Sequence, residues 1–290
     1  MKLKNKVALV TGAGRGIGEA IANSFAQEGA AVMLVSRTES EVAAVASRIT
    51  ARGGRAGAIA GDVSRPDDVE RIASRTRTAF GPIDVLVNSA GVYGPIGPMW
   101  KADVEQWVDA LKTNLVGTFL CCRTVLPEMI ERRNGRIINL AGGGAASPVP
   151  RFSAYACSKA AVARLTETLA EEVREYGVSV NAIAPGLIDT KLQDRVLEAG
   201  PDAGDLFDRI NRLRAEGKGG VSPEIPAALA VFLASDASAG LTGRLIAAPH
   251  DGWEKWDANK IERVMETPWF TVRRIDPFTL KSFAGKSLDD

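Results

Sequence analysis

Residues 7–18 read VALVTGAGRGIG, and this stretch decides the fold. Its first four residues form an apolar run typical of a buried strand, and a turn containing Gly12, Gly16 and Gly18 follows. Glycine is needed in such a turn because a backbone without side chains can approach a pyrophosphate, which then sits at the positive N-terminus of the next helix. A glycine-rich turn alone can reflect tight packing, but between a strand and a helix it indicates dinucleotide binding.

Apolar runs and helix-like periodic segments alternate along the chain, which is the pattern of a parallel sheet with helices on both faces. The expected strands are residues 7–10, 31–35, 56–60, 85–87, 135–140, 179–183 and 244–248, and the expected helices 18–28, 39–52, 66–80, 104–132 and 154–176. The predicted fold class is therefore α/β: a doubly wound Rossmann-type parallel sheet of about seven strands within residues 1–252, followed by a C-terminal extension.

The composition excludes several classes of partner. The chain has 290 residues, 46% of them hydrophobic and 24% charged, which is ordinary for a globular α/β protein. A formal net charge of +1 gives no broad electrostatic footprint for nucleic acid or for an anionic membrane. No apolar run approaches the ~18 residues of a bilayer-spanning helix, and the N-terminus has no signal-peptide pattern, so a cytoplasmic protein is expected.

Metal chemistry is not expected either. The three cysteines, Cys121, Cys122 and Cys157, have no metal-ligand spacing, and His250 is the only histidine of the chain. We therefore predict no metal site, and we interpret the cysteines as buried thiols.

Residues 155–159 read YACSK and suggest an acid/base pair. In a helix, Tyr155 and Lys159 leave the same face one turn apart. A phenol titrates near pH ~10, and a neighbouring ammonium favours its ionised form, which lowers the pKa toward the working range. The spacing alone is a weak signal, but here it follows the glycine turn and residues 88–91, which read NSAG.

These three motifs, in this order, resemble the short-chain dehydrogenase/reductase family over about residues 3–251. The resemblance implies an NAD(P)-dependent oxidoreductase that interconverts a carbonyl and a secondary alcohol, with Tyr155 as general acid/base. It gives Lys159 the roles of lowering the pKa of Tyr155 and binding the ribose, and Asn114 that of holding a water in the proton relay. The expected cofactor-binding residues are Gly12, Arg15, Gly16, Ile17, Gly18, Ser36, Arg37, Asp62, Val63, Asn88, Ala90, Gly91, Tyr155, Lys159, Pro185, Gly186, Ile188 and Thr190.

The residues after the second expected strand bear on the choice of cofactor. A carboxylate at this position would accept hydrogen bonds from the adenosine ribose and repel a 2′-phosphate, but the chain has Ser36 and Arg37 there. Arg15 lies nearby in the glycine turn, and arginine forms bidentate, charge-assisted bonds to phosphate. NADP(H) is therefore favoured over NAD(H), which remains possible.

One residue of the family pattern is missing. The resemblance implies a serine thirteen residues before the tyrosine, where it polarises the substrate oxygen, and this position is Gly142. Three interpretations remain open. Backbone N–H groups of residues 142–144, Gly143 among them, could replace the hydroxyl; Ser147, Ser153 or His250 could stand in; or the protein is a nucleotide-binding, catalytically impaired regulator. Loss of one such donor typically costs ~10²–10³ in rate.

Two segments lie outside the plain alternation. Residues 190–222 follow a strand end and are predicted to form a substrate lid. Residues 253–290 form a tail in which three tryptophans indicate docking on the domain or on a neighbouring subunit, where tail residues and His250 could cover a substrate pocket. The substrate is expected to be a small alcohol or carbonyl compound, and a sugar-like molecule is one candidate. The family resemblance implies a homotetramer or homodimer, with Leu111, Leu115, Phe119 and Cys122 on one helical stripe.

Overall fold

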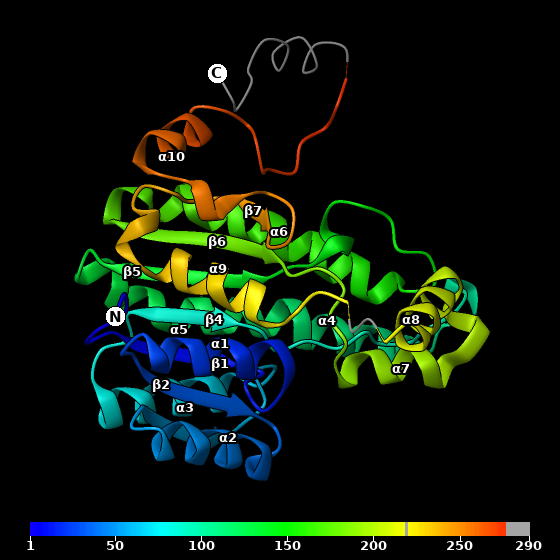
Figure 1. The fold of residues 1–290 in the computed structure, drawn as a ribbon, viewed down its shortest axis with the longest axis horizontal. Helices are drawn as coiled ribbons and strands as arrows, with labels where there is room; N and C mark the ends of the chain where they lie inside the picture. Colours follow the sequence, from blue (N-terminus) through cyan, green and yellow to red (C-terminus); the bar gives the residue numbers. More distant parts are fainter. Residues whose placement is uncertain (218–219, 277–290) are drawn as a thin grey trace.

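The computed structural model describes residues 1–217 and 220–276. A parallel sheet of seven strands, in the order β3-β2-β1-β4-β5-β6-β7, runs through the molecule (Figure 1). This architecture confirms the predicted doubly wound α/β class. The strands are β1 (Val7–Thr11), β2 (Ala31–Ser36), β3 (Arg55–Ala60), β4 (Val85–Asn88), β5 (Gly135–Leu140), β6 (Val178–Ala184) and β7 (Leu245–Ala247). The α-helices are α1 (Gly16–Gln27), α2 (Glu39–Ala51), α3 (Pro66–Phe80), α4 (Val104–Leu111), α5 (Gly117–Glu131), α6 (Ser153–Val173), α7 (Lys191–Ala199), α8 (Asp205–Ala215), α9 (Glu224–Ala234) and α10 (Ala258–Met265).

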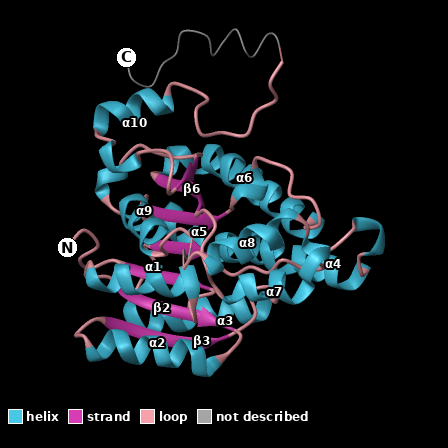
Figure 2. Cartoon of the chain, turned by 45° about the vertical axis from the view of Figure 1, so that its right-hand side comes forward, coloured by secondary structure: helices cyan, strands magenta, loops and turns pink. Residues whose placement is uncertain are grey.

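Helices cover both faces of the sheet, as Figures 1 and 2 show. One hydrophobic cluster joins the sheet to α1, α2 and α9, with Phe25 and Val45 among its buried members. A second cluster joins the opposite face to α3, α5 and α6, and Ile72 and Val125 are among its buried members. A strand covered on both faces reads as a continuous apolar run, which explains why the strands were visible in the sequence. Among the described residues, no helix combines the length and apolar character needed to cross a bilayer.

The site is positioned by the reversal of strand order beside β1. The chain moves outward from β1 to β3 and then returns to place β4 on the other side of β1. Thr11, at the end of β1, is aligned with Asn88, at the end of β4. Where strand order reverses, the loops that follow the two strands diverge and leave a crevice in which ligands bind. The glycine turn and residues 89–91 border this crevice.

The helix expected over residues 104–132 is interrupted in its middle. A π-helical turn, Lys112–Val116, separates α4 from α5. Asn114 lies in this turn, and its Oδ1 accepts a hydrogen bond from Val92 N at 2.8 Å while its Nδ2 donates to Val92 O at 2.8 Å. Such turns occur frequently at functional sites. A regular 3.6-residue period could not reveal it, because the turn depends on a partner loop far away in the sequence.

The insertion after β6 folds into α7 and α8, joined by a short 3-10 turn. Val196 and Ile210 from these helices are buried in a cluster with Tyr93 and Phe152, which belong to the loops after β4 and β5. The insertion therefore packs over the carboxyl end of the sheet. Residues 218 and 219, within the predicted lid 190–222, lie outside the described residues.

The chain after β7 folds back over the free edge of the sheet. Trp253 and Trp256 are buried in the cluster that contains α9, and the ring of Trp253 lies 5.6 Å from that of Phe232. Leu245 N donates to Phe270 O at 2.7 Å, so the tail pairs with the edge strand. Figure 1 shows the described part of the tail, with α10, on the β7 side of the sheet. Residues 277–290 of the predicted tail lie outside the described residues.

The cysteines differ in their surroundings. Cys121 and Cys122 are buried in α5, and burial raises the pKa of the Cys122 thiol to about 12. Cys157 is exposed, which corrects the expectation of three buried thiols. It lies on the outer face of α6, a face that the core does not use.

Candidate active site

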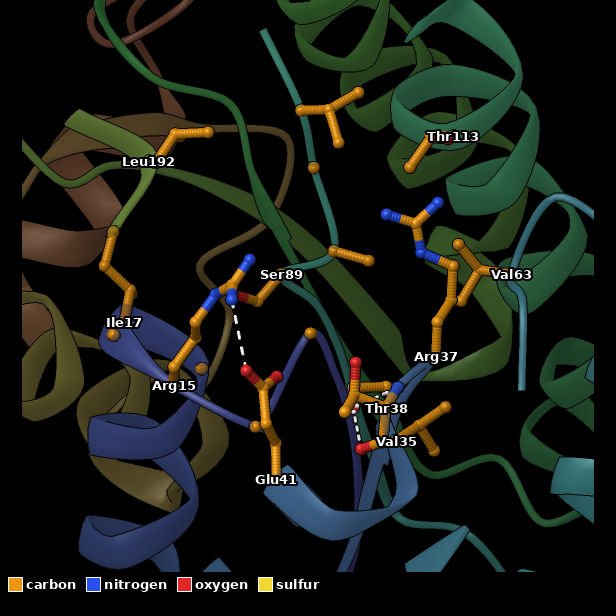
Figure 3. Close-up of a pocket in the computed structure, with 18 of the residues that line it drawn as sticks. Arg15, Ile17, Val35, Arg37, Thr38, Glu41, Val63, Ser89, Thr113 and Leu192 are labelled. Atoms are coloured by element: carbon orange, nitrogen blue, oxygen red, sulfur yellow. Dashed lines mark hydrogen bonds and ion pairs between the residues drawn. The ribbon is translucent and has the colours of Figure 1, made fainter. Parts of the chain in front are cut away.

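A cleft of about 220 Å³ opens at the carboxyl ends of β1, β2 and β4. Most of the predicted cofactor residues line it, and the insertion closes one side of it. Its lining residues are Gly12, Gly14, Arg15, Gly16, Ile17, Gly18, Val35, Ser36, Arg37, Thr38, Glu41, Gly61, Asp62, Val63, Ser89, Ala90, Gly91, Val92, Thr113, Thr190, Lys191 and Leu192. Figure 3 shows the cleft with the side chains that border it.

The glycine turn leaves no room for side chains, as a dinucleotide cradle requires. Gly12 has φ +66°, and a Cβ built on it would lie 2.7 Å from Ala90 N. A larger residue would therefore both strain the turn and push away the loop after β4. The bare turn opens α1, whose N-terminal N–H groups and dipole favour a phosphate. The residues present therefore fit a nicotinamide dinucleotide.

The end of the cleft beside β2 carries more charge than the sequence motifs predicted. Ser36 Oγ donates to Thr38 O at 2.9 Å, and Arg37 is exposed on the wall of the cleft. Arg15 is paired with Glu41, with Nη1 at 3.1 Å from Oε1. Glu41 and Lys191 were missed because no glycine or motif marks them. A signal was available for Glu41, since it lies in the first turn of the helix after β2.

Some predicted cofactor residues do not line the cleft. Asn88 is buried in the sheet, where its Nδ2 donates to Asn139 Oδ1 at 2.9 Å and also to Cys122 Sγ. The Asn88 side chain therefore links β4 to β5 and to α5 within the core, instead of lining the cleft. The other predicted residues outside the lining are Tyr155, Lys159, Pro185, Gly186 and Ile188.

Two of the three predicted catalytic residues, Lys159 and Asn114, meet beside Gly91, and Tyr155 lies next to the lysine. A Cβ built on Gly91 would lie 3.5 Å from Lys159 Nζ and 3.4 Å from Asn114 Oδ1, so both side chains border the cofactor loop. Lys159 Nζ lies 5.7 Å from the ring centre of Tyr155 and donates to Leu140 O at 2.6 Å. Three distant segments, α6, the π-helical turn and the loop after β4, therefore converge on one point of the cleft.

The electrostatics of the pair differ from the expectation. Burial raises the pKa of Tyr155 above its usual value, and the nearby Tyr93 phenol raises it further. Burial also lowers the pKa of Lys159 to about 8. Its ammonium donates to a backbone carbonyl and stands over the phenol ring. The predicted lowering of the tyrosine pKa is therefore corrected, because burial disfavours the charged phenolate.

Lys159 gives the stability of the protein a testable dependence on pH. Its pKa is lowered from 10.5 to about 8 by folding, so between these values the unfolded chain binds more protons. Unfolding free energy should therefore rise with pH across this window. Relative to wild type, Lys159→Met should gain stability near pH 7, by at most a few kcal/mol at ~1.4 kcal/mol per pKa unit. Denaturant unfolding of both proteins from pH 7 to 10.5 measures the difference; parallel curves would contradict the assignment.

Gly142 occupies the position of the missing hydroxyl, and its surroundings are unusual. It has φ +101°, and a Cβ built on it would lie 2.8 Å from the Tyr155 hydroxyl. Gly143 and Gly144 then open a 3-10 turn, Gly143–Ala145. N–H groups at the start of a helical turn have no partner within it, which leaves them free to bind another group. The loop therefore brings backbone, and no side chain, next to the phenol.

The other predicted stand-ins are placed less favourably. Ser153 Oγ accepts a hydrogen bond from Trp107 Nε1 at 3.1 Å. Ser147 is exposed beyond the 3-10 turn, and His250 is exposed after β7. The described contacts bring none of the three to the phenol of Tyr155.

Sequence reasoning missed a second tyrosine beside the first. The ring of Tyr93 packs edge-on at 4.9 Å from Tyr155 and at 5.1 Å from Phe152. Its hydroxyl donates to Gln193 Oε1 at 3.3 Å, which connects the active-site loop to α7 of the insertion. Burial raises the pKa of Tyr93 to about 12, so this phenol keeps its proton at neutral pH. Its position directly after residues 88–91 was the available signal.

Comparisons with known proteins agree with this geometry. The short chain dehydrogenase family model matches residues 6–200, more than half of the chain. Short-chain reductase protein NovJ of Streptomyces niveus is 39% identical over 244 residues, 84% of this chain and 92% of that protein. Among solved structures, an actinorhodin polyketide ketoreductase with NADPH has a TM-score of 0.77 and 32% identity, over 83% of this chain and 95% of that one. NAD⁺-bound xylitol dehydrogenase has a TM-score of 0.78 and 29% identity, over 85% and 98%.

Three independent lines therefore agree. The sheet order places a glycine-bordered cleft beside β1, Lys159 reaches Gly91 in the lining of that cleft with Tyr155 next to the lysine, and the matched relatives share most of their length with this chain. The chain belongs to the short-chain dehydrogenase/reductase family of NAD(P)-dependent oxidoreductases.

Proposed function

We propose that this protein is an NADP(H)-dependent oxidoreductase that interconverts a carbonyl and a secondary alcohol on a small, sugar- or polyol-like molecule. The observation that carries the proposal is that Lys159 and Asn114 meet beside Gly91, a residue of the cleft lining, with the ring of Tyr155 5.7 Å from Lys159 Nζ. A xylitol dehydrogenase among the structural relatives supports a polyol substrate.

The residues divide the work between binding and proton transfer. The glycine turn and the loop after β4 would hold the pyrophosphate, and Lys159 the nicotinamide ribose. When bound, the nicotinamide supplies the hydride in reduction and accepts it in oxidation. Tyr155 gives its proton to the carbonyl oxygen or takes it from the alcohol. Asn114 would hold a water of the proton relay next to Lys159. Because the pKa of Tyr155 is raised, it holds the proton that carbonyl reduction requires.

The substrate oxygen would be bound by the backbone of residues 142–144. Gly142 carries no side chain that could donate, but its backbone approaches the Tyr155 hydroxyl, and the N–H groups that open the 3-10 turn follow directly after it. Such preorganised donors act like an oxyanion hole in a dry site. The insertion, residues 190–222, would act as the lid that keeps the site dry, held by the hydrogen bond between Tyr93 and Gln193.

Cofactor preference is the first test of the proposal. Arg37 on the cleft wall favours a 2′-phosphate, so NADPH should bind more tightly than NADH, and Arg37→Asp should reverse the preference by ~10–100-fold, the size of a charged hydrogen bond. Calorimetric titration of both proteins with both cofactors measures this. Wild-type protein that binds NADH as tightly as NADPH would contradict the proposed preference.

A second candidate function follows from one observation. The missing hydroxyl at Gly142 would suit a protein that binds the nucleotide and responds to it without efficient turnover. A panel of polyols, sugars and ketones, assayed with both cofactors, separates the two functions. Turnover on any member supports the enzyme; tight cofactor binding without turnover supports the regulator.

We also propose a homo-oligomer, a homodimer or homotetramer, formed through the face of α4 and α5. Phe119 is 47% exposed there, and Val104, Val108 and Val116 are exposed beside it. Cys122, which the sequence placed on this stripe, is buried in the core instead. Exposed apolar patches of this kind mark association surfaces.

A further inference from the structure

Glu41 is the carboxylate of the cleft lining to which neither the motifs nor the proposed mechanism gives a role. It lies in the first turn of α2 and lines the end of the cleft beside β2. Its Oε1 receives Arg15 Nη1 at 3.1 Å, a contact drawn as a dashed line in Figure 3. Lys191 Nζ, from the first residue of α7, lies 4.0 Å from the same oxygen. Glu41 is therefore where the glycine turn and the insertion meet.

Glu41 also stands beside the residue that ends β2. A Cβ built on Gly14 would lie 3.0 Å from Glu41 Oε2 and 3.2 Å from Ser36 Oγ, so both oxygens flank one point. In dinucleotide-binding folds, a carboxylate in this region accepts the ribose 2′-hydroxyl, whereas an arginine accommodates a 2′-phosphate. Here the strand ends in a serine, and a carboxylate arrives from the neighbouring helix instead.

The ion pair with Arg15 does little for folding. Arg15 is 57% exposed and Glu41 is 26% exposed, and pairs this accessible to solvent contribute little to stability. Its larger consequence concerns what enters the cleft. Figure 3 shows Arg15 turned toward Glu41, while Arg37 lies on the other side of the cleft. A 2′-phosphate would have to draw Arg15 away from Glu41. The negative charge of the Glu41 carboxylate would also repel the phosphate.

We propose that Glu41 moderates the choice between the two cofactors: its carboxylate holds Arg15, opposes a 2′-phosphate and accepts hydrogen bonds from the ribose hydroxyls of NAD(H). This inference rests on the proposed function and refines it. Arg15 and Arg37 favour NADP(H), and Glu41 lowers the ratio of NADP(H) affinity to NAD(H) affinity that they produce. The protein would therefore retain usable affinity for both cofactors.

The test is calorimetric titration of wild type, Glu41→Gln and Glu39→Gln with NADPH and NADH. Glu39 is exposed on the same helix and outside the cleft lining, so it controls for charge alone. Glu41→Gln should raise the ratio of NADPH to NADH affinity about tenfold or more, and higher salt should shrink the change. The ratio of the affinities for adenosine 2′,5′-bisphosphate and adenosine 5′-phosphate should rise in Glu41→Gln in the same way. Thermal unfolding should be unchanged.

Each outcome bears on a different claim. An unchanged ratio in Glu41→Gln, or an equal change in Glu39→Gln, would overturn the role of Glu41 while leaving the enzyme assignment intact. Failure of the wild type to bind either cofactor would overturn the proposed function itself, and the role of Glu41 with it. A shift confined to Glu41→Gln supports the inference.

Discussion

Tyr155→Phe should abolish turnover while leaving cofactor affinity nearly unchanged. The phenylalanine ring can keep the packing against Tyr93, at 4.9 Å between ring centres, but it has no proton to give or take. General acid/base groups contribute typically ~10²–10⁴ in rate, so the variant should lose about two to four orders of magnitude if the phenol is the only proton donor at the substrate oxygen. Steady-state turnover on a substrate found by the panel, together with NADPH calorimetry, gives both quantities.

Tyr176→Phe is a matched control, because it removes the same hydroxyl from a residue at the far end of α6, in the 3-10 turn Arg174–Tyr176. It should retain wild-type turnover. If Tyr155→Phe also keeps wild-type turnover, Tyr155 is not the acid/base group. If it loses cofactor affinity as well, the phenol contributes to nucleotide binding beyond proton transfer.

Gly142→Ser should lower activity although it restores the hydroxyl of the family pattern. The new Cβ would lie 2.8 Å from the Tyr155 hydroxyl, closer than real Cβ contacts allow, and the φ of +101° strains any residue with a side chain. Such backbone strain costs roughly 1–3 kcal/mol, so the melting temperature should fall by several degrees. Displacing the phenol from its position should reduce turnover by ~10²-fold, since small misplacements of catalytic groups cost this much.

Gly143→Ser provides the control. A Cβ at Gly143 meets no atom within 4 Å, so this variant adds the same hydroxyl in open space and should remain stable. A rise of ~10²-fold in the turnover of Gly142→Ser, the size of one oxyanion donor, would show instead that the natural protein is an impaired enzyme. Such a rise would overturn the proposed backbone role of this loop and strengthen the regulator as the alternative.

The features predicted correctly from the sequence depend on local or periodic patterns. The apolar runs gave the strands because each strand is covered on both faces, and the turn after β1 was recognisable because only glycine fits where Ala90 N would meet a Cβ at 2.7 Å. The pairing of Tyr155 with Lys159 follows from one helical turn. These patterns were sufficient to predict the fold class, the family and the proximity of Tyr155 to Lys159.

What only the tertiary structure decided depends on segments far apart in the chain. The π-helical turn at Asn114 forms against Val92, and the pKa of Tyr155 is raised by burial and by the nearby Tyr93, while Lys159 donates to a backbone carbonyl. Glu41 reaches Arg15 across 26 residues. The sequence determines which reactive groups the protein has, and its short-range patterns determine which of them lie one helical turn apart. Their charges, partners and available space are set by long-range packing and desolvation, which no local pattern encodes.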